Sequence, residues 1–210
     1  SAASDVYKRQ DVGQHQMLVS QYAEITPGKQ LVMSGGLGTM GYGFPGGVGA
    51  KIGNLDKPVI VISGDGGMQM NIQEFATAMC QETNIIVCVL NNYYLGMVRQ
   101  IQQLFYGKRY EATCLKRRKA CPPRCKGPGA DCPPYEPDFV KLAEAMGAKG
   151  YRVTSQEEFK EAFKEALESE VPVLIDCIIN CDDKVWPMVA PGEAISSSFT
   201  GEDLAKKQQS

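Results

Sequence analysis

Short apolar runs alternate with helical patterns along most of this chain. The runs Pro58 to Ser63 and Asn84 to Leu90 are rich in β-branched residues and end at Gly or Asn, which is typical of buried parallel strands. Leu31 to Ser34, Lys149 to Val153 and Pro172 to Ile179 have the same character. The alternation predicts an α/β fold, a three-layer parallel sheet with helices on both faces.

Helical spacing fills the intervals between these runs. Asn71 with Glu74, and Ser155 with Glu158, have the spacing of a capping box, and apolar residues recur on one face after each pair. Helices are therefore predicted at Tyr42 to Ile52, from Asn71 onward, at Asp138 to Met146 and from Ser155 onward. The small residues of the first of these helices allow close backbone packing.

Two polar clusters follow neighbouring predicted strands. Asp65 lies in Gly64-Asp65-Gly66-Gly67, and Asn92 ends Asn91-Asn92. Either cluster alone is more often a plain turn or strand end, but ligands of parallel sheets bind at the carboxyl ends of strands. A carboxylate and an amide oxygen suit Mg²⁺, and a helix amino end near Asn71 would add donors for a diphosphate. Together the clusters predict a magnesium and diphosphate site.

The segment from Gly64 to Asn92 resembles the thiamine diphosphate motif, in which GDG is followed at a fixed interval by NN, and the step from Asp65 to Asn92 is 27 residues. Four further segments resemble the catalytic subunit of acetolactate synthase, and they occur in the same order. They are DVGQHQM (11 to 17), SGGLGTMGYGFPGGVGAK (34 to 51), NNYYLGMVRQ (91 to 100) and VWPMVAPG (185 to 192).

The resemblance implies a thiamine diphosphate-binding PP domain with specific residue roles. Asp65, Asn92 and the main-chain carbonyl of Tyr94 would hold Mg²⁺. The Gly38 carbonyl would accept the aminopyrimidine's amino proton, and Met40 would be the apolar wedge that bends the cofactor. The other implied cofactor contacts are Gln14, His15, Gly64, Gly66, Gly67, Leu95, Gly96 and Met97.

Two of these assignments have competing interpretations, and one neighbouring position departs from the family pattern. His15 is the sole histidine and invites a catalytic role, although a structural or backbone contact at the diphosphate is favoured. Gly96 to Gln100 matches the segment on the substrate side of the cofactor, but ordinary helix amphipathicity also explains it. Ile101 stands where many members have a tryptophan associated with stacking of planar inhibitors.

By resemblance, the whole enzyme condenses two pyruvates, or pyruvate and 2-oxobutyrate, to a 2-aceto-2-hydroxy acid with loss of CO2. This begins isoleucine and valine synthesis. The implied cofactors are thiamine diphosphate, Mg²⁺ and, in the complete enzyme, FAD. The implied partners are 2-oxo acids, further copies in a homodimer or higher oligomer with its active site at the subunit interface, and a small regulatory subunit.

In that family this domain is the last of three, and the activating glutamate lies on the first domain of a neighbouring subunit. No catalytic residue is assigned here, and we expect the isolated chain to be inactive. Two other interpretations stay open. One is another thiamine diphosphate enzyme, such as a pyruvate oxidase or 2-oxo acid decarboxylase, and the other is a non-catalytic assembly module.

Length and composition fit one domain with extensions. We predict the cofactor domain at 11–180, a tail acting as a mobile lid at 181–210, and a non-native or truncated lead-in at 1–10, because YKRQ is polar where a strand is expected. The formal charge of −2 argues against nucleic-acid binding. No apolar run approaches the ~18 residues of a membrane helix, and no secretory signal opens the chain. We expect a soluble, cytoplasmic protein.

An insert at 113–137 holds six prolines, six Lys or Arg, and the cysteine pattern C-x6-C-x3-C-x6-C. Its thiols, Cys114, Cys121, Cys125 and Cys132, could bind zinc or an iron–sulfur cluster. The pattern lacks the close C-x2-C pair of most zinc sites, and a solvated loop is the favoured alternative. Cys80 and Cys88 are expected to pack in the core.

Overall fold

The computed structural model describes residues 7–24, 30–122, 125, 127–129, 132 and 135–209. These residues form a six-stranded sheet with the order β2-β1-β3-β4-β6-β5, and every neighbouring pair is parallel. The strands are β1 (Tyr7–Gln10), β2 (Gln30–Met33), β3 (Val59–Gly64), β4 (Ile86–Asn91), β5 (Lys149–Val153) and β6 (Val173–Ile178). The predicted parallel sheet is confirmed.

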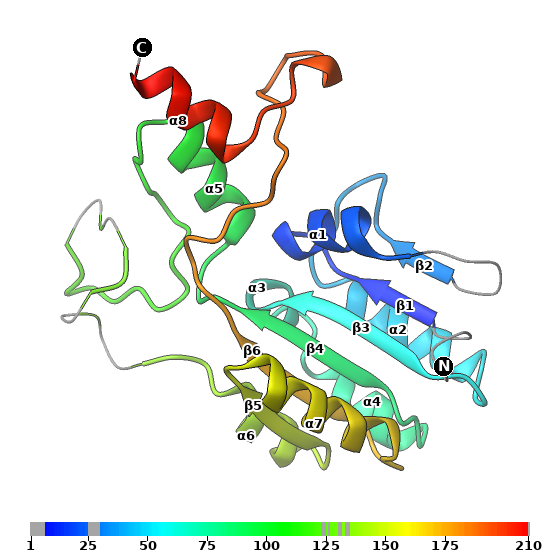
Figure 1. Cartoon of the computed structure of the whole chain (residues 1–210). Helices are drawn as coiled ribbons and strands as arrows, with labels where there is room; N and C mark the ends of the chain where they lie inside the picture. The colour runs from blue at the N-terminus through cyan, green and yellow to red at the C-terminus, as the bar shows by residue number, and fades with distance from the viewer. Residues whose placement is uncertain are drawn as a thin grey trace.

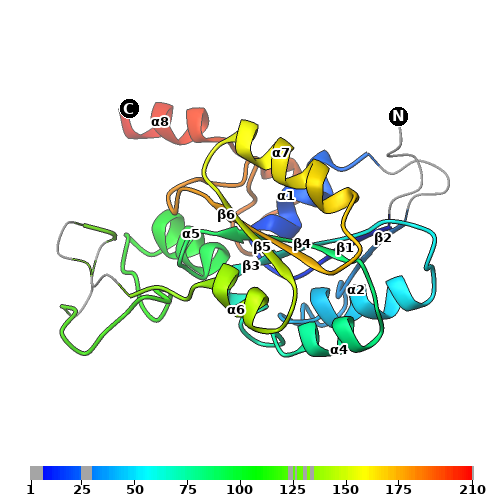
Figure 2. The same ribbon diagram turned by 90° about the horizontal axis from the view of Figure 1, so that it is seen from below.

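Helices cover both faces of this sheet (Figures 1 and 2). They are α1 (Gln14–Tyr22), α2 (Gly43–Ile52), α3 (Asp65–Met68), α4 (Glu74–Cys80), α5 (Gly96–Phe105), α6 (Phe139–Ala145), α7 (Gln156–Leu167) and α8 (Gly201–Gln209), with the short 3-10 helix η1 (Ile195–Ser197). Figure 2 shows α2, α4 and α6 on one face and α1 and α7 on the other. The predicted three-layer arrangement is therefore present.

The larger core cluster lies between the sheet and α2, α4 and α6. Phe44 and Phe75 are almost fully buried, and their ring centroids are 4.6 Å apart. Gly47 lets α2 approach β3, because a Cβ added there would lie 2.3 Å from Val61 Cγ2. Each fully buried large apolar side chain contributes about 1.5–3 kcal/mol to the stability of the fold. The contact at Gly47 shows that the small residues of α2 allow the close packing that the sequence predicts.

Helix starts are predicted correctly in three cases, including Tyr42 before α2, and wrongly in one. Ser155 and Glu158 form the predicted capping box of α7, and Asp138 caps α6 through the Lys141 amide. Asn71 does not cap a helix, because its side chain donates to the Gly41 carbonyl at 2.8 Å and α4 begins at Glu74. Asn71 is therefore not the amino end of a helix, and a short helix, α3, begins at Asp65 directly after β3.

The two cysteines expected in the core differ in their exposure to solvent. Cys88, on β4, is buried, whereas Cys80, the last residue of α4, is exposed. The expectation for Cys80 is wrong, because α4 ends there and the side chain lies outside the helix face that packs on the sheet. Cys177, on β6, is the buried thiol that accompanies Cys88 in the smaller core cluster.

The segment Tyr7–Gln10 is a strand, β1, between β2 and β3. The predicted domain boundary at residue 11 is therefore too late for the sheet, while residues 1–6 lie outside the described part. A strand pairs through its backbone, so polar side chains do not prevent this placement. Burying such a side chain has a cost at Gln10, which is fully buried and whose Oε1 has no hydrogen-bond partner within the described ranges.

We expect the substitution Gln10→Leu to raise the free energy of unfolding by about 1–3 kcal/mol, because it removes a buried unsatisfied carbonyl at similar volume. Urea unfolding measures this. Gln156→Leu, at an exposed position of α7, is the control and should change stability by less than about 0.5 kcal/mol. A less stable Gln10→Leu variant would show that the Gln10 amide is well accommodated.

The tail after β6 packs against α5 (Figure 1). Val185 is buried and exchanges two hydrogen bonds with the Gln100 side chain, each 3.0 Å long. Phe199 lies edge-on to Phe105 and close to Trp186. These contacts hold the tail beside the ends of the strands, and its action as a lid stays a prediction. Among the described residues, no helix is both long and apolar enough to cross a membrane.

Candidate cofactor site

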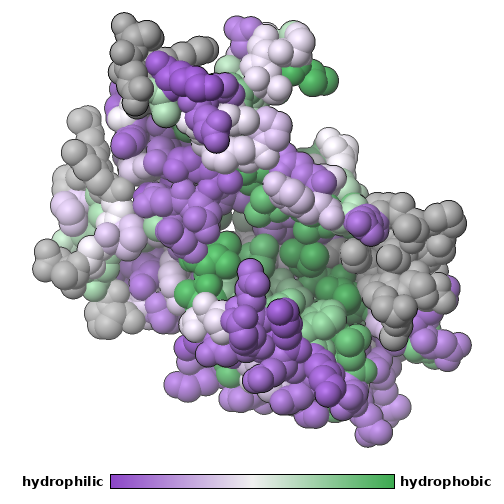
Figure 3. Space-filling model, in the orientation of Figure 1, coloured by the Kyte–Doolittle hydropathy of each residue, from purple (hydrophilic) through white to green (hydrophobic). Residues whose placement is uncertain are grey.

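A cavity of about 420 Å³ lies at the carboxyl ends of the central strands, and Figure 3 shows a hydrophobic hollow on this face of the molecule. All the residues that the sequence implies as cofactor contacts line this cavity. They are Gln14, His15, Gly38, Met40, Gly64, Asp65, Gly66, Gly67, Asn92, Tyr94, Leu95, Gly96 and Met97. Segments far apart in the sequence are thus brought to one place.

Asp65 is a buried carboxyl group that lines the cavity. It follows β3 directly and is only 4% exposed. Its Oδ1 accepts from the Gly66 amide at 2.8 Å, while its Oδ2 is buried with no partner among the described residues. Burial raises the pKa of Asp65 to about 7, although backbone donors from Gly66, Tyr93 and Asn92 lower it in part. A buried oxygen of this kind fits a cation.

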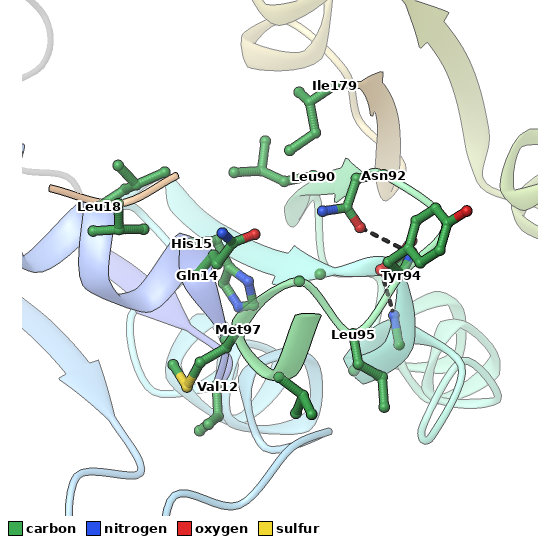
Figure 4. A pocket seen from close by; sticks show the side chains of 18 of the residues that line it. Val12, Gln14, His15, Leu18, Leu90, Asn92, Tyr94, Leu95, Met97 and Ile179 are labelled. Carbon is green, nitrogen blue, oxygen red and sulfur yellow. Dashed lines mark hydrogen bonds between the residues drawn. The ribbon is translucent and has the colours of Figure 1, made fainter. Parts of the chain in front are cut away.

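Asn92 and Tyr94 approach the same region from the end of β4. The Tyr94 amide donates to Asn92 Oδ1 at 2.9 Å, which leaves that oxygen a second lone pair, and Figure 4 shows this bond at the cavity wall. Asn91 has a different role, since its side chain donates to the buried Asp176 at 2.9 Å. Only the second asparagine of the pair faces the cavity.

The loop after β2 brings Gly38 and Met40 to the cavity. Gly38 has a left-handed backbone with φ of 62°, which glycine adopts without strain. A Cβ added at Gly66 would lie 3.3 Å from Met40 Cε and 2.7 Å from Leu95 Cδ2. Glycine at position 66 therefore keeps space between these two apolar side chains.

Asp11 anchors that loop, although the sequence motifs did not single it out. It is 1% exposed and accepts from the Gly41 amide at 2.8 and 3.0 Å and from Ser63 Oγ at 3.0 Å. A Cβ at Gly67 would lie 2.0 Å from Asp11 Oδ2. The available signal was an aspartate placed at the end of a strand, next to a glycine-rich loop.

Gln14 connects three of the motifs. Its side-chain amide donates to Gln100 Oε1 at 2.6 Å and to the Asp183 carbonyl at 3.1 Å, and Gln100 in turn bonds Val185. A side chain at Gly96 would collide with the Gln14 amide. Helices α1 and α5 and the tail are thus fixed relative to one another at the cavity.

The segment predicted on the substrate side divides between two faces of α5. Met97 and Val98 line the cavity. Arg99 is buried, pairs with Asp182 at 3.0 Å and lies over the rings of Tyr94 and Tyr110 at 4.5 and 4.1 Å from their centroids. Arg99 therefore packs against the loop that carries Tyr94. Ile101 lines a separate surface groove.

His15 is a buried, neutral group of this site. The residue is 6% exposed, its Nε2 has no partner among the described residues, and burial lowers its pKa to about 4. Cβ atoms at Gly13 and Gly64 would lie 2.7 and 3.1 Å from His15 Cε1. The imidazole is held between two glycines, which suits a packing role beside the cofactor.

His15 should make the chain sensitive to acid. Its pKa is 6.5 when unfolded and about 4 when folded, so between these values only the unfolded chain binds the proton, and stability falls as pH falls through this window. Between pH 7.5 and 5, the variant His15→Gln should lose about 2 kcal/mol less stability than the parent. Denaturant titrations measure this difference. The single histidine NMR signal gives a direct check, and titration near pH 6.5 would contradict the expectation.

The four insert cysteines do not form a simple metal site. Among the described residues, no three His, Cys, Asp or Glu side chains are placed to hold one metal ion. The cysteines instead line a second cavity, which adjoins the first and shares Asn92, Tyr94, Ile179 and Asn180 with it.

Comparison with known proteins identifies the family. Residues 11–177 match the thiamine pyrophosphate enzyme, C-terminal TPP binding domain. The chain belongs to this family. This match confirms the resemblance that the sequence motifs indicated. Residues of those motifs line the cavity of this TPP-binding domain.

The relatives with this domain include acetolactate synthase large subunits. Identity is 41% to that of Cyanidium caldarium, covering 89% of this chain and 29% of the relative, and 43% to that of Corynebacterium glutamicum, covering 88% and 28%. The isozyme 2 large subunit of Escherichia coli (strain K12) is 38% identical, over 89% and 31%. The chain spans less than a third of the length of these relatives.

A solved structure supports the fold of the TPP-binding domain. It is the thiamine diphosphate-dependent 4-hydroxybenzoylformate decarboxylase of Rhodococcus jostii RHA1, with a TM-score of 0.69 and 24% identity over 84% of this chain and 30% of that one. At this identity the likeness concerns the fold alone.

Proposed function

We propose that this TPP-binding domain binds thiamine diphosphate and Mg²⁺ as part of an acetolactate synthase. The observation that carries the proposal is the buried Oδ2 of Asp65, which has no hydrogen-bond partner in the described part of the chain and belongs to a cavity that Asn92 and Tyr94 also line. A carboxylate left in this state is costly unless a cation binds it. The donor set, with one carboxylate, one amide oxygen and a main-chain carbonyl, suits Mg²⁺ that also contacts phosphate.

Each group of the cavity then has a defined task. Asp65, Asn92 and the Tyr94 carbonyl would hold the metal, and the backbone amides after Gly64 would face the diphosphate. The Gly38 carbonyl would orient the aminopyrimidine, and Met40 would support the bent form. When bound, the cofactor supplies an electron sink for decarboxylation of a 2-oxo acid. The contribution of the protein is positioning and exclusion of water.

The relatives favour acetolactate formation as the reaction of the complete protein. All three of the relatives described above are acetolactate synthase large subunits. The substrates would be two pyruvates, or pyruvate and 2-oxobutyrate, in the pathway to branched-chain amino acids. FAD, a regulatory small subunit, a homo-oligomer and a cytoplasmic location complete this proposal.

Calorimetry tests cofactor binding directly. Thiamine diphosphate titrated into the chain with Mg²⁺ present should bind at one site, and chelation of Mg²⁺ should weaken binding at least about tenfold, because two negatively charged groups would then face each other. Binding that is equal with and without Mg²⁺ would contradict the assigned metal site.

We expect no acetolactate from pyruvate when the chain is supplied with both cofactors. The cavity is lined by two aspartates but by no glutamate among the described residues, so this part of the chain supplies no glutamate to exchange a proton with the aminopyrimidine. A colorimetric acetolactate assay measures this, with the binding-competent chain as sample. Robust turnover would show that an acid of this chain performs that task.

A further inference from the structure

Five cysteines surround the second cavity, which has a volume of about 250 Å³. All five are free thiols. Four belong to the insert, and the fifth comes from the start of the tail; they are Cys114, Cys121, Cys125, Cys132 and Cys181. Segments from two parts of the chain therefore direct thiols to one space, which a plain solvated loop does not require.

Two of these thiols occupy matching turns. The Arg118 amide donates to Cys121 Sγ at 3.3 Å, and the Gly129 amide donates to Cys132 Sγ at 3.3 Å. The Cys121 amide in turn donates to the Arg118 carbonyl, and the Cys132 amide donates to the Gly129 carbonyl, each at 3.0 Å. Hydrogen bonds to the ligand sulfurs are one of the features by which proteins tune iron–sulfur clusters.

The geometry discriminates between one ion and a cluster. A single zinc ion needs its thiolates gathered at about 2.3 Å from one point, and no such group exists among the described residues. In a four-iron cluster each thiolate binds a different iron, so the sulfurs surround the cluster. The cavity volume of about 250 Å³ is several times the roughly 30 Å³ of one water, which leaves room for a cluster.

The charges around the cavity suit an anionic occupant. Lys116 and Arg117 both line it, and Glu136 pairs with Lys116 at 3.0 Å, so these three side chains have a net positive charge. Four thiolates make a cluster site negative, and positive side chains offset that charge.

We propose that this cavity binds a [4Fe–4S] cluster through four of its five cysteines. Cys121, Cys125 and Cys132 supply three ligands, and Cys114 or Cys181 supplies the fourth. Cys114 is paired with Tyr94 in an antiparallel bridge, so the cluster adjoins the loop that lines the cofactor cavity. The cluster itself does not depend on the proposed function, since its ligands lie outside the predicted Mg²⁺ and diphosphate contacts.

Metal analysis of the full chain, purified without oxygen and incubated with ferric iron, sulfide and an excess of a small thiol that reduces part of the iron, tests the proposal. We expect about four iron and four acid-labile sulfide per chain, with the broad visible absorption of a cluster. Cys121→Ser and Cys125→Ser should each lower the iron content several-fold. Cys80→Ser, at an exposed position on α4, is the matched control and should retain it.

Circular dichroism separates cluster loss from unfolding, because the insert lies outside the sheet and the variants should keep their secondary structure. One bound zinc per chain in place of iron would overturn the cluster. So would iron that is unaffected by the Cys121 and Cys125 variants, or a chain that takes up no metal. The readout requires no thiamine diphosphate, so failure here and failure of the proposed function are distinguishable.

Discussion

Replacing Asp65 with alanine should weaken Mg²⁺-dependent binding of thiamine diphosphate by about 100-fold or more. The variant removes a carboxylate of the cavity whose Oδ2 is buried without a hydrogen-bond partner among the residues that the structure describes. Interactions with a charged partner contribute about 1.5–3 kcal/mol each, and 1.4 kcal/mol is a factor of ten in affinity. Calorimetry at fixed Mg²⁺ measures the change, and Asp56→Ala, at an exposed turn, is the control.

The Asp65 carboxylate should favour cofactor binding but lower the stability of the folded chain. Burial raises the pKa of Asp65 to about 7 from 3.8, which means that the ionised carboxylate is destabilising in the folded, cofactor-free chain. Asp65→Asn keeps the volume and removes the charge, so at pH 8 it should raise the free energy of unfolding by about 2–4 kcal/mol. A variant that loses both binding and stability would indicate a structural role for Asp65 instead.

The meeting of Asp65 and Asn92 could be predicted from sequence because of strand pairing. Both residues follow β-branched runs, and β3 and β4 are parallel neighbours in which Gly64 lies opposite Leu90. The carboxyl ends of such strands necessarily lie at one edge of the sheet. Local pattern and topology therefore agree, and the position of the site followed from two short motifs.

Residues whose partners are distant in sequence could not be predicted in this way. Asn71 has the spacing of a cap, but its side chain bonds Gly41, 30 residues away, and this tertiary contact overrides the local motif. The polar strand β1 pairs through its backbone, and the hydropathy of its side chains does not reveal this pairing. The convergence of Cys181 with the insert likewise depends on the path of the chain after β6.

Asp11 is such a residue, and Asp11→Ala should lower the free energy of unfolding by about 3–5 kcal/mol. The substitution leaves the Gly41 amide and Ser63 Oγ without the acceptor they have now, and each lost bond to a buried charged acceptor costs about 1.5–3 kcal/mol. Urea unfolding measures this loss. Because Asp11 fixes the loop that carries Gly38 and Met40, thiamine diphosphate should also bind more weakly, at temperatures where the variant is still folded.

Graded variants distinguish an anchoring role of Asp11 from a general loss of packing. Asp11→Asn retains an oxygen that accepts from the Gly41 amide, so its cost should be about 1–2 kcal/mol, smaller than that of the alanine variant. Gly67→Ala should resemble Asp11→Ala, since its Cβ would occupy the place of Asp11 Oδ2. If Asp11→Ala were as stable as Asp56→Ala, the hydrogen bonds of Asp11 would contribute nothing to holding the loop at the cofactor cavity.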